Sequence, residues 1–210
     1  MDKDFLREAY RRLRKNGAPG LSGRTAKDYK SALEINLADL HKRLKEKRYK
    51  APLIKRVWID KGDGKKRPIG LSEFEDMIVQ KAVSMLIGAV FEQDFYPFSH
   101  GFRERHSAHD AIKEIRESIR TQNTGWIIDA DISGFFDNID RSQLKGFIRK
   151  RVKDGGLLRL IGQWLNAGVI EGEVVSYNDK GTPQGGLCKA VHNDPCGTPL
   201  LAAQNKPLSI

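Results

Sequence analysis

Residues 126–140 read Trp-Ile-Ile-Asp-Ala-Asp-Ile-Ser-Gly-Phe-Phe-Asp-Asn-Ile-Asp, and this stretch decides the fold that we expect. Its apolar start, Trp126–Ile128, predicts a buried strand. The strand would carry Asp129 and Asp131 at its carboxyl end, two residues apart, so that both side chains point to one face. A turn then presents two adjacent rings, the second of which is Phe136.

The two carboxylates suit a divalent cation. Two-metal phosphoryl transfer needs acidic oxygens that hold Mg²⁺ ions roughly 4 Å apart. Asp131 offers one ligand and the carbonyl oxygen of Ile132 could offer a second, whereas Asp129 lies closer to the strand body and could instead form structural hydrogen bonds. Taken alone, Asp-x-Asp is more typical of ordinary aspartates at a strand end, and no second carboxylate motif follows in this chain.

Composition is that of an ordinary globular protein. The chain has 210 residues, 39% hydrophobic and 30% charged, which is long enough for a sizeable core. No apolar run approaches the roughly 20 residues of a membrane-spanning helix, and the charged start MDKDFLREAY is not typical of a signal peptide. We therefore expect a cytoplasmic location and no membrane partner.

Positive charge is concentrated in the first third of the chain. Residues 1–70 contain 21 Lys and Arg against 9 Asp and Glu, a net charge of +12, whereas residues 71–210 contain 16 against 18, a net charge of −2. A basic lobe beside a near-neutral, carboxylate-bearing lobe suits a protein that binds a phosphate backbone and performs metal chemistry next to it. A solvated basic face without a ligand is the alternative.

Hydrophobic periodicity and turn residues predict an α+β chain. Helices are expected at about 2–15, 25–47, 73–92, 108–121, 141–152 and 156–167. Strands are expected at 53–60, 66–71, 126–131, 169–170 and 174–177, of which the first two and the last two can form hairpins. Thr25, with Asp28 three residues on, predicts a capping box, and Ser107 predicts a second N-cap.

Three further segments could carry chemistry. The glycine-bearing hairpin tip Lys61–Pro68 has four basic residues that could fold over a triphosphate, although a solvated turn is the more common use of such a sequence. In the loop Ser99–Ser107, Arg103 and Arg105 could reach phosphates or could pair with nearby acids. Gly181–Gly186 contains three glycines and a proline, which would fix an unusual backbone path. That path would hold in position the side-chain amide of its one glutamine, which can donate and accept hydrogen bonds.

Taken in order, these segments resemble the group II intron-encoded reverse transcriptases of the bacterial retron and intron type. The likeness runs from about residue 10 to 186, with Ser22 and His100 where Asp and Tyr are usual. The segments that carry it are the N-terminal extension motif at 17–25, the fingers hairpin at 61–71, its adjoining helix at 75–82, the template-contacting loop at 100–103, and two palm motifs at 129–138 and 181–186.

The resemblance implies a role for each matching residue. Asp131 would be the catalytic Mg²⁺ ligand, with the Ile132 carbonyl beside it. Phe136 would exclude ribonucleotides, and Lys61 and Arg67 would hold the triphosphate of an incoming dNTP. Gln184 would border the nucleotide pocket, and Arg103 and Arg105 would contact the template strand.

The resemblance also implies a fold and an activity. The fold would be reverse transcriptase fingers with an N-terminal extension (1–125), a partial palm whose antiparallel sheet is packed by helices (126–186), and an irregular, disordered tail (187–210). The activity would be that of an RNA-directed DNA polymerase, a nucleotidyltransferase that uses Mg²⁺, dNTPs, an RNA template and a DNA primer or target. The basic lobe would bind template and intron RNA through backbone and shape.

From Leu187 onward the sequence departs from the family. The family continues to a Tyr-x-Asp-Asp hairpin and a helical thumb, but no Asp-Asp pair occurs in this chain. The resemblance therefore predicts a fragment truncated before that motif, with an open sheet edge, exposed apolar surface and no polymerisation by itself. An RNA-binding, maturase-like module that assists splicing without catalysis is the alternative, and a product without function is a third possibility.

The last 25 residues contain both cysteines, Cys188 and Cys196, with His192 midway between them. This spacing fits no common zinc module and lacks a fourth ligand. Reduced, incidental thiols are the better interpretation for a cytosolic chain.

Overall fold

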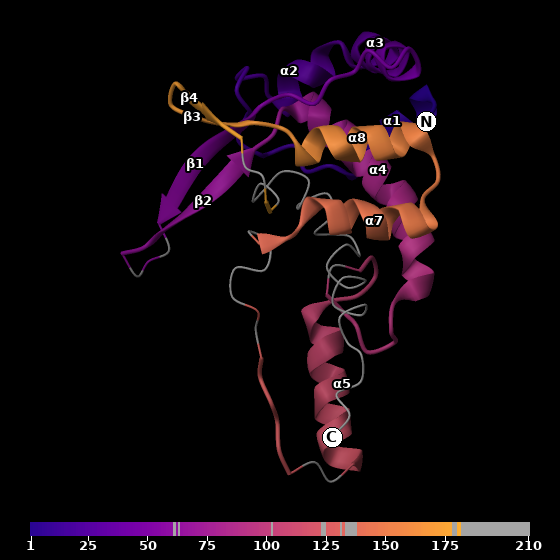
Figure 1. The fold of residues 1–210 in the computed structure, drawn as a ribbon, viewed down its shortest axis with the longest axis vertical. Helices are drawn as coiled ribbons and strands as arrows, with labels where there is room; N and C mark the ends of the chain where they lie inside the picture. The colour runs from indigo at the N-terminus through magenta and orange to yellow at the C-terminus, as the bar shows by residue number, and fades with distance from the viewer. Residues whose placement is uncertain are drawn as a thin grey trace.

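The computed structural model describes residues 1–60, 62, 64–101, 103–122, 125–130, 132, 138–177 and 180–181 (Figure 1). Its helices are α1 (Lys3–Arg12), α2 (Ala26–Ser31), α3 (Leu33–Lys45), α4 (Phe74–Phe91), the short 3₁₀ helix η1 (Glu92–Asp94), α5 (Ala108–Thr121), α7 (Arg141–Arg151) and α8 (Gly155–Leu165). Its strands are β1 (Ile54–Asp60), β2 (Lys66–Leu71), β3 (Val169–Glu171) and β4 (Val174–Ser176). These elements confirm the α+β class.

The four strands of the described residues form one sheet in the order β2-β1-β3-β4. Each hairpin is antiparallel, but β1 and β3 run parallel, with Ile54 opposite Val169 and Lys55 opposite Ile170. This parallel pair departs from the expected antiparallel sheet. It arises because helices intervene between β1 and β3 in the sequence, and such a crossover returns the chain to the end of the sheet where β1 began.

Helix α4 is the centre of the core, as its apolar sequence predicts. Ile78 and Val79 have no exposed surface, and the helix is buried on several sides. Helix α1 packs against it through Leu6 and its neighbours. Tyr10 of α1 meets Phe74 edge to face, with ring centroids 6.0 Å apart, so the N-terminal segment is fixed to the start of α4.

The long helix expected at 25–47 is instead two helices, α2 and α3, separated at Ala32. Thr25 and Asp28 form the predicted capping box, but Ala32 has φ −130° and ψ 41°, outside the helical region. The side-chain amide of Asn36 donates a hydrogen bond of 2.9 Å to the carbonyl of Tyr29. This bond satisfies a backbone group freed by the break, while the ring of Tyr29 packs in the core.

A buried carboxylate joins three segments that are far apart in the sequence. Asp76 of α4 is only 2% exposed, and it accepts hydrogen bonds from the Tyr49 hydroxyl, from Trp164 Nε1 at 2.7 Å and from Gln80 Nε2 at 2.6 Å. Burial raises the pKa of Asp76 above the usual carboxyl value, and the three hydrogen bonds oppose that rise. Because Trp164 lies on α8, this cluster holds α8 against α4 and so places β3 beside β1.

The buried strand predicted at 126–131 is not present in its described part. Residues 125–130 form no strand, and Trp126 and Ile128 are 91% and 90% exposed. In Figure 1 this segment runs as an extended trace alongside α5. No other described segment pairs with it. A strand without a neighbouring strand must form its backbone hydrogen bonds with water. The apolar side chains of Trp126 and Ile128 are therefore exposed to solvent, whereas the sequence predicts them buried.

Within the described residues, no helix combines the length and the apolar character that crossing a membrane requires.

Candidate functional site

The structure places the residues that directly follow the first predicted palm motif beside the start of the second. The Gly181 amide donates a hydrogen bond of 2.9 Å to the Ile139 carbonyl, and Arg141 Nε donates one of 2.9 Å to the Gly181 carbonyl. Arg141 begins α7, and Asp140 caps that helix by accepting from Ser142 N and Gln143 N. Ile139, directly after the 129–138 motif, and Gly181, the first residue of the 181–186 motif, thus lie together at the N-terminus of α7.

Several predicted site residues lie outside the described residues, namely Lys61, Asp131, Phe136 and Gln184. Cys188, His192, Cys196 and the whole tail from residue 187 lie outside them too. Of the described members of the first palm motif, Asp129 and Ile132 are both exposed. The roles expected for these residues stay predictions.

The described residues do not by themselves supply a metal centre. No three His, Cys, Asp or Glu side chains in that part of the chain are grouped so that they could hold an ion. Of the predicted Mg²⁺ donors only Ile132 is described, and its donor would be a backbone carbonyl. A Mg²⁺ site here therefore depends on the carboxylate of Asp131.

The hairpin of β1 and β2 forms as predicted and projects from the helices (Figure 1). Its tip turns through Gly62 and Gly64, whose φ angles of 83° and 76° favour glycine. Arg67 lies on β2 opposite Ile59, and its side chain is exposed. The hairpin therefore holds this predicted triphosphate ligand on a strand that is hydrogen-bonded to its neighbour.

The guanidinium of Arg103 is engaged inside its own loop. It forms an ion pair of 2.6 Å with Glu92 and donates to the Tyr96 and Ser99 carbonyls at 3.1 and 2.7 Å. It also lies 4.9 Å from the centre of the Phe95 ring. This is the pairing with nearby acids that the sequence left open, and a template contact by Arg103 would require it to exchange one of these partners.

Arg105 differs from Arg103 in both conformation and exposure. Its side chain is exposed, and its φ of 65° is unusual for a residue with a Cβ. The neighbouring Glu104 contacts Lys81 of α4 at 3.5 Å and Arg12 of α1 at 3.7 Å. The loop is therefore tied to α4 and α1 through Glu104, next to the exposed side chain of Arg105.

Two contacts that position the site were not predicted. Ser22 N and Oγ donate to Glu73 at 2.7 and 2.5 Å, which joins the N-terminal loop to the start of α4. Trp58 Nε1 donates to Glu171 at 2.6 Å, which joins the two hairpins. Each contact links residues more than 50 positions apart, and such pairs leave no periodic signal in a single sequence.

Comparison with known proteins identifies the family of the chain. Residues 59–189 match the family described as "Reverse transcriptase (RNA-dependent DNA polymerase)". The chain is 33% identical over 185 residues to the group II intron-encoded protein LtrA of Lactococcus lactis subsp. cremoris, covering 88% of this chain and 31% of that protein. It is 32% identical over 190 residues to protein YkfC of Escherichia coli K12, covering 88% of this chain and 50% of that protein.

Shorter and more distant similarities agree with these. Nuclear intron maturase 1, mitochondrial, of Arabidopsis thaliana is 34% identical over 101 residues, which cover 47% of this chain and 14% of that protein. Among solved structures, a chain of a partial Cas6-RT-Cas1–Cas2 complex superposes with a TM-score of 0.52 at 21% identity, covering 90% of this chain and 32% of that chain. The chain thus spans half or less of the length of these proteins.

Proposed function

The chain belongs to the reverse transcriptase family, and on that premise we propose that it is the N-terminal part of a group II intron-encoded RNA-directed DNA polymerase. Its fingers and partial palm would place a dNTP and an RNA template around Asp131. The observation that carries the proposal is the link between Ile139, Arg141 and Gly181, because it joins the borders of the two motifs whose residues would line the reaction site.

The residue roles in this proposal follow the family pattern. Lys61 and Arg67 bind the triphosphate, Phe136 packs against the sugar and rejects a 2′-hydroxyl, and Gln184 borders the base. Arg105 contacts the template strand, joined by Arg103 once that residue releases Glu92. Mg²⁺ bound by Asp131 and the Ile132 carbonyl would stabilise the charge that develops on the transferred phosphoryl group.

Nucleotide capture tests this proposal without requiring polymerisation. A photoreactive dUTP analogue should label the wild-type chain, and dTTP should compete better than UTP. Arg67→Ala should reduce labelling, and Phe136→Ala should reduce the preference for dTTP. Lys27→Ala, which removes an exposed charge from α2, is the matched control. Labelling that is unaffected by Arg67→Ala, or equal competition by dTTP and UTP, would contradict the proposal.

Polymerisation itself should be absent from residues 1–210 alone. They contain no Asp-Asp pair, and loss of one member of a catalytic carboxylate set removes most of the rate. A primer-extension assay on an RNA template should give no DNA above the protein-free control. Extension by this chain would show that the missing carboxylate is not essential.

A second candidate function is RNA binding that assists splicing, without DNA synthesis. The net charge of +12 in residues 1–70 favours it, and so does the similarity to a protein named as an intron maturase. Both functions would use the basic lobe, but only DNA synthesis would need the residues that are predicted to bind the nucleotide. Splicing assistance in the cytoplasm that survives Asp131→Asn and Arg67→Ala would support the second candidate.

A further inference from the structure

Three tryptophans occupy three different environments. Trp164 is 1% exposed and bonded to Asp76 in the core, whereas Trp126 is 91% exposed. Trp58 is intermediate, because 49% of its surface is exposed while its indole N–H donates to Glu171 at 2.6 Å. Its one polar atom is therefore satisfied and its orientation is set, so what it still presents to solvent is apolar ring surface.

The orientation of Trp58 is supported from the next strand. Glu171 is the last residue of β3, and Arg56 of β1 lies 3.7 Å from its second carboxylate oxygen. The Glu171 carboxylate is paired with Arg56 and also accepts the hydrogen bond of Trp58, so it restrains the indole ring. The indole thus has little rotamer freedom left to lose when a ligand covers it.

The side chains around Trp58 leave it uncovered. Pro68 is directly opposite on β2, and Val174 of β4, opposite Glu171, is 70% exposed. Because strand residues alternate between faces, Trp58 shares its face with Arg56, while Arg67 and its partner Ile59 lie on the other face. The indole is therefore on the opposite side of the hairpin from the predicted triphosphate ligand.

The charge around this face favours a polyanion. The hairpin, residues 54–71, contains 6 Lys and Arg against 2 Asp and Glu, a net charge of +4. On the face that carries Trp58, Asp60 lies opposite Lys66 and Glu171 lies near Arg56, so positive and negative charges are paired there. The attraction for a polyanion therefore comes from the net positive charge of the whole hairpin. A restrained aromatic ring on a cationic hairpin matches single-stranded nucleic acid, whose phosphates are attracted and whose bases stack.

We propose that Trp58 is a stacking site for an unpaired nucleobase, on the hairpin face opposite Arg67. The inference rests on the proposed function for the presence of RNA, and it adds a contact with the strand outside the reaction site. RNA and DNA single strands share the stacking chemistry. We expect RNA to be the natural ligand because the relatives are intron-encoded proteins.

The test is the affinity of the 210-residue chain for a 12-nucleotide oligo(U), for oligo(dT) of the same length, and for an abasic strand of the same length. Trp58→Ala should weaken oligo(U) binding by roughly 5- to 150-fold, which corresponds to a stacking free energy of about 1–3 kcal/mol. Trp58→Phe should retain most of the affinity. The abasic strand should bind wild type and Trp58→Ala equally, because it offers phosphates and no base.

Two controls separate stacking from other causes. Trp126→Ala removes another exposed indole and should leave the affinity for oligo(U) unchanged. The slope of log affinity against log salt should be the same for Trp58→Ala and wild type, because stacking releases no counterions. Weaker binding of oligo(dT) than of oligo(U) by wild type identifies RNA as the natural ligand, and the reverse order overturns that assignment.

Each failure has a distinct meaning. If wild type binds oligo(U) and Trp58→Ala binds it equally well, the stacking site is disproved and the proposed function stands. Equal losses on oligo(U) and on the abasic strand also disprove stacking, since they point to a general effect on the hairpin. Failure of wild type to bind any of the strands would contradict RNA binding by the chain, and with it the proposed function.

Discussion

Gly20 lies against the backbone at the start of α4. A Cβ at this position would come within 2.8 Å of Glu73 N and 2.9 Å of Glu73 Cα. The same Glu73 receives the two hydrogen bonds of Ser22, so the loop cannot move away without losing them. The glycine thus explains how the N-terminal loop can lie so close to the helix that carries Asp76.

Gly20→Ala should therefore lower the free energy of unfolding by about 1–3 kcal/mol, the usual cost of inserting a methyl group where no space exists. Urea denaturation measures the change. Gly17→Ala is the matched control in the same loop, because a Cβ there meets nothing within 4 Å. Equal stabilities of the two variants would contradict this close contact.

Asp76 should make stability depend on pH in an unusual direction. Its pKa is raised in the folded state, so the folded chain keeps the proton to a higher pH than the unfolded chain does. This contribution to stability is fully present below the ordinary carboxyl pKa of about 4 and is lost as the pH rises through the raised pKa of Asp76.

Asp76→Asn removes this titration while keeping an oxygen that can accept from Tyr49 and Trp164. We expect the stability of the variant, relative to wild type, to increase as the pH rises from 4 to 8. Urea denaturation at several pH values gives the difference directly. A difference that stays constant with pH would show that burial does not raise the pKa of Asp76.

At the scale of elements, α5 exposes an apolar stripe. Ile112, Ile115 and Ile119 are 61%, 54% and 39% exposed, and a groove of about 310 Å³ separates part of this helix from Trp126 and Phe98. Exposed apolar patches of this kind favour self-association. The helix itself is specified locally, by the capping box of Ser107 and Asp110.

Ile115→Ser should therefore lower the free energy of unfolding by about 1 kcal/mol or less, because half of the side chain is already in water. It should also reduce self-association in sedimentation velocity. Ile78→Ser, in the fully buried face of α4, should cost at least the roughly 2–5 kcal/mol of a large-to-small core change. Comparable costs for the two substitutions would mean that α5 is covered in solution.

The elements that the sequence predicted well are those specified by local signals. The capping residues Thr25 and Ser107 and the glycine turn at 62–64 define helix starts and a hairpin within a few residues. The strand at 126–131 has the right composition, but a strand also needs a partner, and composition does not supply one. The break at Ala32 was missed because the leucine periodicity continues on both sides of it.

The site residues, too, could be placed from the sequence only where a local signal specifies their position. Arg67 could be placed because it lies in a local hairpin. The engagement of Arg103 with Glu92 depends on how the loop folds back on the end of α4, and the sequence left that alternative open. The contact between Ile139 and Gly181 spans more than 40 residues, and only the family pattern suggested that the two motifs lie together.

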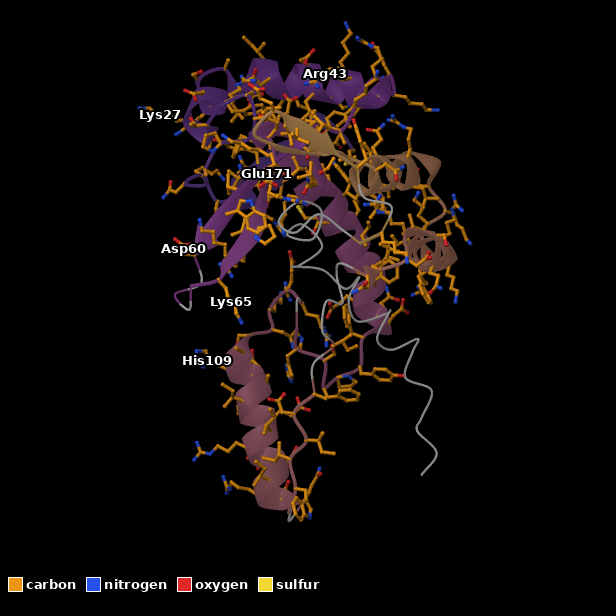
Figure 2. All side chains as sticks on the ribbon, turned by 60° about the vertical axis from the view of Figure 1, so that its left-hand side comes forward. Lys27, Arg43, Asp60, Lys65, His109 and Glu171 are labelled. Atoms are coloured by element: carbon orange, nitrogen blue, oxygen red, sulfur yellow. The ribbon has the colours of Figure 1, made fainter. Side chains whose placement is uncertain are left out.

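At the scale of the whole molecule, the distribution of charge predicts how RNA binds. Exposed lysines lie on α2 and α3, among them Lys27, labelled in Figure 2, and Lys42. The affinity for a structured intron RNA should fall steeply with salt, since each neutralised phosphate releases counterions. Replacing Lys27, Lys30, Lys42 and Lys45 with alanine should weaken binding and reduce the salt slope.

The matched control is Lys113→Ala with Arg116→Ala on α5, where two exposed charges are removed outside residues 1–70. This pair should change the affinity and the salt slope much less. RNA affinity that is insensitive to salt, or an equal loss from both sets of substitutions, would contradict binding through the basic N-terminal lobe.

We propose that Asp131 binds a metal ion close to the contact between Ile139 and Gly181, and paramagnetic broadening by Mn²⁺ is the sharpest test of this role. In ¹⁵N-labelled protein, Mn²⁺ should broaden the amide signals of Ile132, Ile139 and Gly181 before those of α2 and α3, and Asp131→Asn should abolish the effect. Broadening that begins elsewhere in the chain, or that is the same in Asp131→Asn, would rule out a metal site at Asp131.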